Sequence, residues 1–486
     1  MELKKLLNEL QYEVIKGNDN VNVNEIDYDS RKVKQNDVFV CIKGFQSDGH
    51  KFASSAIEKG AKVIVCEDEI NCSEDITIIK VKDTRKALAK MGANFYDNPS
   101  KKMKIIGVTG TNGKTTTAFM IKTILEEAGF KSGLIGTIAN FIGKEKIHTE
   151  RTTPESLELQ ELFNEMVQKG CKYCVMEVSS HSLALDRVYG IEFEAGIFTN
   201  LTRDHLDFHK TFENYYKAKY ELFKRSKVSI INSDDAYGVR AIEDIKNDGL
   251  SNLVTYSIKS DSNYKAQNEI CESTHIDYTL KYNDKEEKIR VGLPGEFNIY
   301  NSLGAIACMD SLNIPMESIK KGISEVVVLG RCEKTGLKYN LPYTIILDYA
   351  HTPDGLQNIL ETARGFTKNR LISVFGCGGD RDKVKRPQMG KIGTDLSDIS
   401  IVTSDNPRTE NPTSIINDII KGIDKQNYEV IENRKEAIER AIDIAKSGDV
   451  LVIAGKGHED YQILSTGKIH FDEREVVDEI LSRKLK

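Results

Sequence analysis

The sequence predicts an α/β protein of three domains: a mixed α/β domain, a central domain on a parallel sheet that follows a P-loop pattern, and a C-terminal α/β domain. Its 486 residues exceed one usual domain, which holds about 100–200 residues. Short apolar runs alternate with helical patterns beyond residue 100, which is typical of parallel sheets. Turn-rich breaks occur at Asp97-Asn98-Pro99-Ser100 and at Gly330-Arg331. We therefore expect domains at 1–99, 100–330 and 331–486.

Composition excludes several classes of protein. The chain is 39% hydrophobic and 29% charged with a net charge of −6, so no sequence-wide attraction to nucleic acid or to an anionic membrane is expected. Apolar runs such as Val450–Ala454 are far shorter than the about 20 residues of a membrane span. The first residues form an amphipathic helical pattern (Leu3, Leu6, Leu7, Leu10, Val14) rather than a signal peptide. We expect a cytoplasmic protein without membrane insertion.

The nine cysteines show no disulfide or zinc spacing, which favours a reducing compartment. Cys171 and Cys174 form the one close pair, in a strand-like run without a second pair to complete a metal site. Buried packing is therefore favoured over redox or metal chemistry.

The expected strands are short apolar runs. In the first domain they are Val38–Val40 and 63–65, and in the second they are Lys104–Thr109, 173–178, 196–199 and 228–231. In the third they are 345–347, Leu371–Phe375, Ile399–Val402 and Val450–Ala454. Seven polar, glycine-containing or charged segments begin where such strands end: 110–116, 177–181, 199–207, 348–354, 376–382, 404–408 and 455–459. Because open parallel sheets bind ligands at the carboxyl ends of their strands, these segments predict two facing halves of an active site.

The first of these segments has the features of a phosphate-binding loop. A strand is followed by the run Gly110-Thr111-Asn112-Gly113-Lys114-Thr115-Thr116 and then by a helical pattern that Gly129 closes. Glycines let backbone N–H groups converge on phosphate oxygens, Lys114 can reach the terminal phosphates, and the Thr115 hydroxyl can hold Mg²⁺. The first glycine of the usual pattern is replaced by Val108, and a turn that binds nothing is the alternative. Strand, loop, Lys-Thr pair and helix together favour nucleotide binding.

Two strand ends carry candidate metal ligands. Glu177 ends its strand with a carboxylate, a ligand type that Mg²⁺ prefers, although a solvated acid is the alternative. His205, Asp207 and His209 are spaced as in a transition-metal site or as in a polar loop, and the sequence does not decide between them.

Four motifs occur in one order: Gly110-Thr-Asn-Gly-Lys-Thr-Thr116, Glu177-Val-Ser-Ser-His181, Asn200-Leu-Thr-Arg-Asp-His205 and Asp348-Tyr-Ala-His-Thr-Pro353. Together they resemble the Mur ligases, ATP-dependent amide ligases of peptidoglycan precursor synthesis, over nearly the whole chain. Within the family the chain is most similar to members that add meso-2,6-diaminopimelate to UDP-N-acetylmuramoyl-L-alanyl-D-glutamate. The resemblance implies an N-terminal uridine-nucleotide domain, a central ATPase domain and a Rossmann-like C-terminal domain in a monomer with small-molecule substrates.

The resemblance also implies a two-step reaction. ATP phosphorylates the D-glutamyl γ-carboxylate, and the amine of the amino acid then displaces phosphate. Both steps build negative charge on oxygens, which Lys114 and Mg²⁺ can stabilise. The resemblance assigns Thr115, Glu177, His205 and an N-carboxylated Lys219 to the magnesium site. From the residues alone, Lys219 does not differ from Lys217 on the same predicted helix, and an ordinary surface lysine is the alternative.

By resemblance, the remaining residues fall into three binding sites. Asn298, Arg331 and Asp348 would contact the adenosine side of ATP, although Asn298 could instead cap a helix and Arg331 could form a salt bridge. The uridine nucleotide and peptide would be bound by Tyr28, Ser30, Phe45, Gln46, Ser47, Thr152, Thr153, Ser179 and Arg187. Ser30, Thr152 and Ser179 could equally be loop or cap residues. Two positions depart from the family pattern: Leu185 replaces a glutamine, and Arg151 replaces an asparagine of some members.

The amino-acid site would consist of Arg381, Asp405, Asn406, Pro407, Arg408, Gly455 and Glu459. Diaminopimelate has a distal carboxylate that lysine lacks, and an arginine fork binds a carboxylate with two hydrogen bonds. Arg408 and Arg381 would bind carboxylates, and Gly455 and Glu459 would accept the distal ammonium. A plain turn is the alternative for Asp-Asn-Pro-Arg alone. Lysine would leave Arg408 without a partner, so diaminopimelate is favoured.

Three other functions stay open: L-lysine addition, folyl-polyglutamate synthesis, and a P-loop switch that binds nucleotide and changes partners. Asp-Asn-Pro-Arg and a uridine-binding domain do not favour the folate reaction. A switch would not need seven polar strand-end segments, whereas a ligase with several substrates would.

Overall fold

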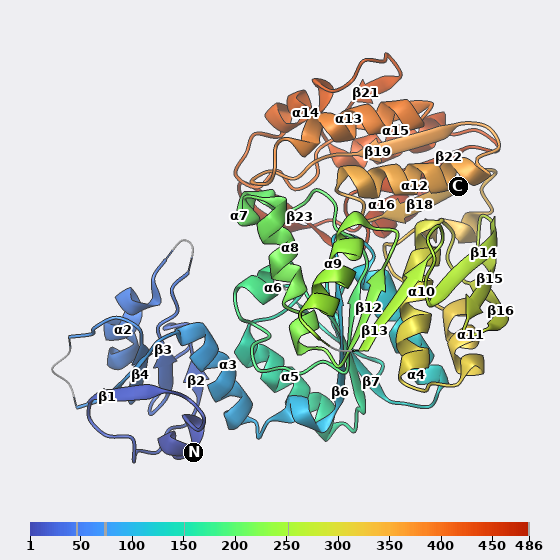
Figure 1. Cartoon of the computed structure of the whole chain (residues 1–486). Coiled ribbons are helices and arrows are strands. Elements are labelled where there is room, and N and C mark those ends of the chain that lie inside the picture. The colour runs from blue at the N-terminus through green and yellow to red at the C-terminus, as the bar shows by residue number, and fades with distance from the viewer. Residues whose placement is uncertain (45–46, 72–74, 150, 251, 485–486) are drawn as a thin grey trace. The chain divides into compact units, whose positions relative to one another are not determined.

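The computed structural model covers the whole chain and describes residues 1–44, 47–71, 75–149, 151–250 and 252–484 (Figure 1). Helices and strands alternate through the chain, as expected for an α/β protein. The contacts divide it into two compact units. Unit 1 is Met1–Gly107, Phe130–Glu194 and Lys224–Lys227, and unit 2 is Val108–Gly129, Ala195–Phe223 and Val228–Lys486.

The first sheet of unit 1 has the order β1-β5-β4-β3-β2, with β1 antiparallel to its neighbour and the others parallel. Its strands are β1 (Tyr12–Lys16), β2 (Ile26–Asp27), β3 (Val38–Val40), β4 (Val63–Cys66) and β5 (Thr77–Val81). Alternate side chains enter opposite cores: Val38 and Val40 pack with α3 (Thr84–Phe95), and Phe39 packs with α2 (Ala53–Glu58). The mixed α/β prediction for this part is confirmed.

The amphipathic pattern at the start of the chain is wrong beyond its first turn. Helix α1 comprises only Leu3–Leu6, because the chain turns at Glu9 with φ 61° and then enters β1. Val14 lies in that strand with 36% of its surface exposed, so it does not extend an apolar helix face.

The other strands of unit 1 follow the order β6-β10-β7-β8-β9, in which β10 and β7 are parallel and β8 and β9 are antiparallel additions. They are β6 (Lys104–Thr109), β7 (Ser132–Ile135), β8 (Asn140–Ile142), β9 (Glu145–Ile147) and β10 (Tyr173–Glu177), with helices α5 (Ser156–Gln168) and α6 (Ser180–Ala184). Strand β6 begins in unit 1 and ends in unit 2. Cys171 and Cys174 are both buried free thiols, and burial raises the pKa of Cys174, which confirms the packing interpretation.

Unit 2 contains the sheet order β16-β15-β14-β13-β12-β11, parallel from β11 to β14 and antiparallel from β14 to β16. The strands are β11 (Ala195–Phe198), β12 (Val228–Asn232), β13 (Asn252–Ser257), β14 (Tyr264–Cys271), β15 (Ile276–Tyr282) and β16 (Lys285–Val291). The helices are α4 (Lys114–Glu127), α7 (Leu206–His209), α8 (Phe212–Tyr220), α9 (Ala236–Asn247), α10 (Phe297–Ser311) and α11 (Met316–Ser324). An aromatic core of Tyr215, Tyr216 and Phe223 packs beside Phe198 at the end of β11. This packing buries the inner face of α8.

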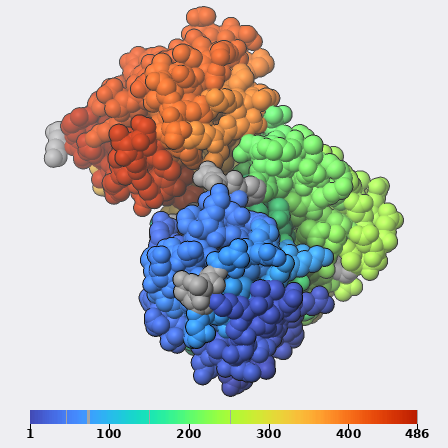
Figure 2. Space-filling model, turned by 90° about the vertical axis from the view of Figure 1, so that its left-hand side faces the viewer, coloured from blue at the N-terminus to red at the C-terminus, as the bar shows by residue number. Residues whose placement is uncertain are grey.

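The C-terminal sheet has the order β17-β18-β22-β19-β20-β21, with only β17 antiparallel. Its strands are β17 (Glu333–Thr335), β18 (Thr344–Asp348), β19 (Leu371–Phe375), β20 (Ile399–Val402), β21 (Tyr428–Val430) and β22 (Val450–Ala454). Its helices are α12 (Pro353–Phe366), α13 (Lys385–Leu396), α14 (Pro412–Ile420), α15 (Arg434–Ile444) and α16 (Glu473–Lys484), and β23 (Tyr461–Leu464) and β24 (Gly467–His470) form a hairpin. These residues, orange to red, form one continuous body in Figure 2.

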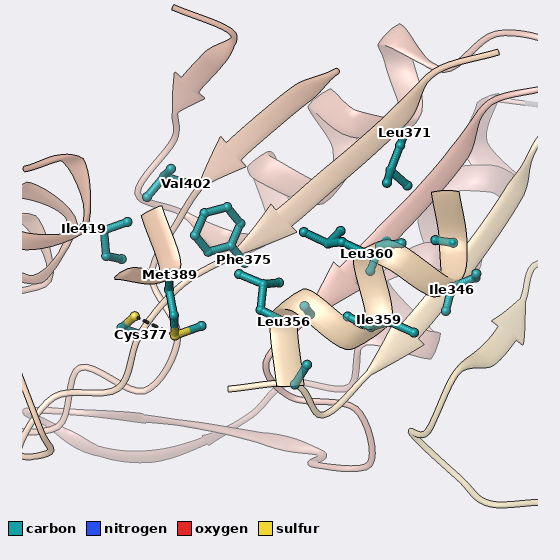
Figure 3. Close-up of a cluster of buried hydrophobic side chains, with 14 of the residues drawn as sticks. Ile346, Leu356, Ile359, Leu360, Leu371, Phe375, Cys377, Met389, Val402 and Ile419 are labelled. Carbon is teal, nitrogen blue, oxygen red and sulfur yellow. Dashed lines mark hydrogen bonds between the residues drawn. The ribbon is translucent and has the colours of Figure 1, made fainter. Parts of the chain in front are cut away.

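Both faces of this sheet are covered. Phe375 and Val402 face α12, α13 and α14 in a core where Met389 contacts Cys377 (Figure 3). Alternate strand residues such as Val374 and Ile453 face α15 and α16. A parallel sheet buried on both faces is what continuous apolar runs predict.

All seven polar segments begin at or within two residues of a strand end, as predicted. Within the described residues, no helix combines the length and apolar content needed for a membrane span.

Candidate functional site

The phosphate-binding loop is formed by backbone conformations that only glycine tolerates. Gly110 has φ 150°, and a Cβ there would lie 1.8 Å from Thr199 Oγ1. Gly113 has φ 86°, and its Cβ would lie 2.3 Å from Asn301 Oδ1. Val108, at the departure from the usual pattern, is a buried residue of β6 and leaves the loop itself unchanged. Helix α4 begins at Lys114, so its N-terminal N–H groups follow directly from the loop.

The segment after β11 holds this loop. Thr111 N and Asn112 N donate to the backbone and side-chain oxygens of Asn200, both at 2.9 Å. The Thr199 hydroxyl donates to Asn112 O at 2.6 Å. The loop is therefore fixed by the protein itself.

Two lysines point at one carbonyl of the loop. Lys114 Nζ donates to Gly110 O at 2.9 Å, and Lys219 Nζ donates to the same oxygen at 2.7 Å. Lys219 is only 1% exposed and lies 4.6 Å above the Tyr215 ring. Burial, and then the positive charge of Lys114, lower the pKa of Lys219 well below its usual value, while Asp204 opposes the shift. This environment favours a neutral amine.

Asp204 is a site residue that the sequence reasoning missed, although it lies inside a recognised motif. Burial alone would raise its pKa, but the nearby His205, His351 and Lys385 bring it down to about 2. His205 Nε2 lies 3.3 Å from Asp204 Oδ2, and Lys385 Nζ donates to His351 O at 2.8 Å. Asp204 thus brings negative charge into a cluster of cationic groups.

The His-x-Asp-x-His spacing does not form a metal cluster. His209 is buried and stacks on Tyr215 with ring centroids 5.0 Å apart. Over the ranges that the structure describes, the one three-ligand grouping of His, Cys, Asp or Glu is Asp48, His50 and Asp68 in unit 1. There Glu67 N donates to His50 Nε2 at 3.0 Å, and Lys43 Nζ lies 2.8 Å from Asp68 Oδ2. The imidazole acceptor and the Asp68 carboxylate are therefore already occupied.

Glu177 ends β10 in unit 1 and is 1% exposed. Its carboxylate accepts from Thr137 N at 2.9 Å and from the Thr137 hydroxyl at 3.0 Å. The same hydroxyl lies 3.0 Å from Thr152 Oγ1. Thr137, which the sequence did not single out, therefore connects two predicted site residues.

Thr153, Ser179 and Arg187 also lie together in unit 1. Ser179 N donates to Thr153 Oγ1 at 3.1 Å, and Arg187 Nη1 donates to Thr153 O at 3.0 Å. The Ser179 hydroxyl accepts from Ser182 N at 3.1 Å, so Ser179 also caps α6, as its alternative reading predicted.

One carboxylate in unit 1 is surrounded by three guanidinium groups. Glu155 lies 2.9 Å from Arg187 Nε, 2.8 Å from Arg151 Nη1 and 3.7 Å from Arg85 Nη1. Arg151, a departure from the family pattern, thus contacts the same acid as Arg187. The group keeps an excess of positive charge, which suits an anionic substrate.

Of the residues predicted for the uridine nucleotide, Tyr28 donates to Glu158 Oε1 at 2.5 Å. Ser30 is half-buried in a turn, and Ser47 is exposed with its carbonyl accepting from Gly44 N at 2.9 Å. Phe45 and Gln46 lie outside the described residues.

A cavity of about 500 Å³ in unit 2 adjoins the phosphate loop. Its walls include Asn112 and Gly113 of the loop, Phe297 and Tyr300 of α10, and Phe366 at the end of α12. The opening of this space beside a phosphate loop suits the base and sugar of a nucleotide. Its walls also include residues that the sequence did not single out, such as Asn232, Asp235 and Thr362.

Asn298, Arg331 and Asp348 are not among the residues that line this cavity. Asn298 donates to Pro294 O at 2.7 Å and accepts from Asn301, so it does not cap α10. Arg331 Nη2 donates to the Thr115 hydroxyl at 3.2 Å. Asp348 accepts from Cys332 N at 2.7 Å and from Ala350 N at 2.8 Å, and burial raises its pKa. Asp348 orders the turn that carries Arg331.

The predicted amino-acid residues lie together at the carboxyl ends of β19, β20 and β22. Asn406 Nδ2 donates to Glu459 Oε2 at 2.9 Å, and a Cβ on Gly455 would lie 2.5 Å from Asp405 Oδ2. Arg408 has φ 54° after Pro407 and donates to Gly379 O at 2.9 Å. Arg381 is exposed beside it. The site combines two guanidinium groups with two carboxylates.

Lys456, which the sequence did not single out, forms hydrogen bonds with several residues of this pocket. Its fully buried ammonium donates to Asn406 Oδ1 at 2.9 Å, to Glu459 Oε2 at 3.2 Å and to Tyr461 O at 2.7 Å. It therefore neutralises part of the negative charge of Asp405 and Glu459.

Sequence models of three domains match the chain: "Mur ligase family, catalytic domain" at 22–96, "Mur ligase middle domain" at 108–309, and "Mur ligase, glutamate ligase domain" at 330–457. The chain is 62% identical over 485 residues to a UDP-N-acetylmuramoyl-L-alanyl-D-glutamate–2,6-diaminopimelate ligase of Clostridium perfringens, covering 100% of both chains. It is 58% identical to the protein of that name from Clostridium tetani, covering 99% of both.

Solved structures show the same fold. A structure titled as a UDP-N-acetylmuramoyl-L-alanyl-D-glutamate–2,6-diaminopimelate ligase matches with a TM-score of 0.70 and 29% identity, over 100% of this chain and 99% of that one. A Mycobacterium tuberculosis folylpolyglutamate synthase matches with a TM-score of 0.64 and 17% identity, over 83% of this chain and 94% of that one. At that identity the likeness concerns the α/β fold alone.

Proposed function

Because the chain belongs to the Mur ligase family, we propose that it is the ATP-dependent ligase that joins meso-2,6-diaminopimelate to the D-glutamyl γ-carboxylate of UDP-N-acetylmuramoyl-L-alanyl-D-glutamate. The product is a precursor of peptidoglycan. The relatives named above, identical at 62% and 58%, carry this activity in their names.

The observation that carries the choice of amino acid is the pair Arg381 and Arg408 beside Glu459 at one end of the C-terminal sheet. Diaminopimelate presents a distal carboxylate and a distal ammonium, which match the guanidinium pair and the acidic side of the pocket. Lysine offers only the ammonium and would leave Arg408 without an anion. A carboxylate bound by an arginine fork gains two parallel hydrogen bonds.

The residues of unit 2 fit a magnesium ion. Burial favours the neutral amine of Lys219, which is the form that reacts with CO₂. The resulting carbamate would add carboxylate-like oxygens beside the phosphate-binding loop. Thr115, His205 and carbamylated Lys219 would hold the ion. It would supply positive charge to the phosphates.

In the first step, an oxygen of the D-glutamyl γ-carboxylate attacks the γ-phosphorus of ATP, and ADP leaves. Lys114 and the N-terminal N–H groups of α4 stabilise the charge on the phosphate oxygens. Thr111, Asn112 and Gly113 form the loop that would surround those oxygens, and hydrogen bonds to Thr199 and Asn200 fix its position. The cavity beside Phe297 and Tyr300 takes the adenosine part.

In the second step, the neutral amine of diaminopimelate attacks the acyl phosphate carbon, and inorganic phosphate leaves from the tetrahedral intermediate. Arg381, Arg408 and Glu459 fix the distal end of the amino acid, so that the reacting amine approaches in one orientation. Asp405, Asn406, Pro407 and Gly455 shape the loops that present these groups. In unit 1, Thr152, Thr153, Ser179 and Arg187, with Tyr28, Ser30, Phe45, Gln46 and Ser47, bind the UDP-muramoyl dipeptide.

By its resemblance to the Mur ligases, the protein would act as a monomer. ATP and UDP-linked precursors are cytoplasmic metabolites, so the proposed reaction places the protein in the cytoplasm.

The test is release of phosphate from ATP with the UDP-muramoyl dipeptide and Mg²⁺, together with diaminopimelate, L-lysine or no amino acid. We expect rapid release only with diaminopimelate, with a product whose mass is that of the tripeptide. Turnover with lysine alone would contradict the role of Arg408. Hydrolysis that does not depend on an amino acid would favour a nucleotide switch.

A further inference from the structure

The amino-acid pocket holds two like charges close together. A Cβ on Gly378 would lie 2.8 Å from Arg408 Nη1 and 3.9 Å from Arg381 Cγ, so both side chains border one glycine. Burial, and then the charge of Arg381, lower the pKa of Arg408. The two guanidinium groups therefore repel each other, and their loops need other contacts to hold them together.

Backbone contacts join the two loops, 376–382 after β19 and 404–410 after β20. Gly379 N donates to Asn406 O at 2.9 Å, and Arg408 Nη1 donates back to Gly379 O at 2.9 Å. A Cβ on Gly379 would lie 1.9 Å from Pro407 O, so this close approach requires glycine.

Two carboxylates bind the same loops reciprocally. Glu410 Oε1 accepts from Asp380 N at 2.6 Å. Asp380 in turn accepts from the Thr409 hydroxyl at 2.8 Å and from Thr409 N at 3.2 Å. Glu410, from the second loop, thus binds the first loop next to Arg381. Asp380, from the first loop, binds the second loop next to Arg408.

The carboxylate of Glu410 is held in place by Arg386, an arginine that is 0% exposed. Arg386 of α13 donates to both oxygens of Glu410, at 2.8 and 3.0 Å, and to Asp418 at 3.0 Å. It also donates at 3.3 Å to the backbone oxygen of Gly378, the glycine that both arginine side chains border. The Arg386 hydrogen bonds hold the pKa of Glu410 down at about 2, so the carboxylate is charged at neutral pH.

We propose that Glu410, fixed by Arg386, is a positioning residue that holds Arg381 and Arg408 at the spacing needed to bind the distal carboxylate of diaminopimelate. This rests on the proposed function. Binding then costs little reorganisation, because the two positive groups are already assembled before the anion arrives. The chemistry occurs at the phosphate loop, so loss of Glu410 affects binding of the amino acid more than the rate of the bound complex.

The test compares Glu410→Ala with the unchanged protein in steady-state ligation. We expect the KM for diaminopimelate to rise roughly 10-fold, with kcat and the KM values for ATP and the UDP-muramoyl dipeptide changing less than about 2-fold. A residue that only stabilised the domain would lower the amount of active protein, and hence apparent kcat, without changing one KM alone. An unchanged KM for diaminopimelate would overturn the proposal.

Thr409→Val is the second variant, because it removes the hydroxyl bond to Asp380 at an exposed position and leaves Arg386 paired. We expect its KM for diaminopimelate to rise about 2- to 5-fold. If Glu410→Ala does not fold, Glu410→Gln takes its place, because the amide keeps the size of the side chain and loses the charge that pairs with Arg386, and an unchanged KM for diaminopimelate overturns the proposal.

Glu429→Ala is the matched control. Glu429 of β21 pairs with Arg440 at 2.8 Å in the same domain, without contacts to either loop. We expect all its kinetic constants to be unchanged, and an equal rise in KM would overturn the proposal. If the unchanged protein does not ligate diaminopimelate at all, the proposed function fails; if it does and Glu410→Ala behaves like Glu429→Ala, only the positioning role fails.

Discussion

Lys217 and Lys219 lie two positions apart on α8, and the fold gives them opposite environments. The side chain of Lys217 is 68% exposed and pairs with Glu213 at 3.3 Å, an ordinary helix-surface contact. Lys219 lies on the inner face among Tyr215 and Tyr216, and its ammonium is directed at the phosphate loop. Tertiary packing, rather than the neighbouring sequence, separates the two residues.

We predict that Lys219→Ala lowers kcat by about 100-fold or more, because the chain loses the side chain that is proposed to become a carbamate and bind Mg²⁺. Millimolar acetate or propionate should restore part of the activity by supplying a carboxylate to the vacated space. The measurement is phosphate release with and without these anions. Lys217→Ala is the matched control and should keep full activity, whereas full activity in Lys219→Ala would refute a carbamate role.

The residues that sequence reasoning missed are those whose roles depend on distant contacts. Asp204 precedes His205, yet only the approach of His351 and Lys385, which follow it by 147 and 181 residues, makes it the centre of a charged cluster. Thr137 and Lys456 similarly gain their roles from partners in other elements. The residues that sequence predicted well, such as Lys114 and Gly113, belong to a motif whose function is contained in one strand–loop–helix unit.

At the scale of elements, strands with uniformly apolar runs were predictable to within one or two residues. Leu371–Phe375, Ile399–Val402 and Val450–Ala454 match the structure at both ends, because both faces of that sheet are covered by helices. The antiparallel strands β15 and β16 were not predicted. Lys285–Val291, at an edge of its sheet, begins with four charged residues, and only Ile289 and Val291 are buried, a weaker pattern that a polar loop also shows.

The phosphate loop gives a prediction for one element. Gly113→Ala places a Cβ 2.3 Å from Asn301 Oδ1 at a φ of 86°, so the loop and the start of α4 must shift. We expect the KM for ATP to rise at least about 10-fold and the melting temperature to fall by a few degrees. Gly129→Ala, also at positive φ but with nothing within 4 Å of its Cβ, controls for backbone strain alone and should leave the KM for ATP unchanged. Equal KM values in both variants would contradict the steric argument.

At the scale of the whole molecule, one ion pair in unit 2 joins the two halves of the proposed active site. Arg203 Nε lies 3.2 Å from Asp382 Oδ2, and these residues belong to the segments that carry His205 and Arg381. The pair therefore couples the metal-site segment to the amino-acid segment. Partly exposed pairs of this kind contribute about 0.2–1 kcal/mol.

We predict that Arg203→Asp and Asp382→Arg each lower kcat/KM for diaminopimelate about 2- to 5-fold, and that the double exchange restores most of the loss. Restoration would follow because the reversed pair can form the same bridge. The measurement is a double-mutant cycle on kcat/KM. Additive losses in the double variant would show that the two segments act independently.

The cysteines of the protein have a practical consequence. Cys271 is the one exposed thiol among the cysteines that the structure describes, and it lines the 500 Å³ cavity beside the phosphate loop. The other described thiols are buried, and burial raises the pKa of several of them, including Cys41, Cys308 and Cys377. Cys271 therefore offers a natural attachment point for a fluorescent label in the wall of this cavity, so that binding of a ligand there can be followed without engineering a new cysteine.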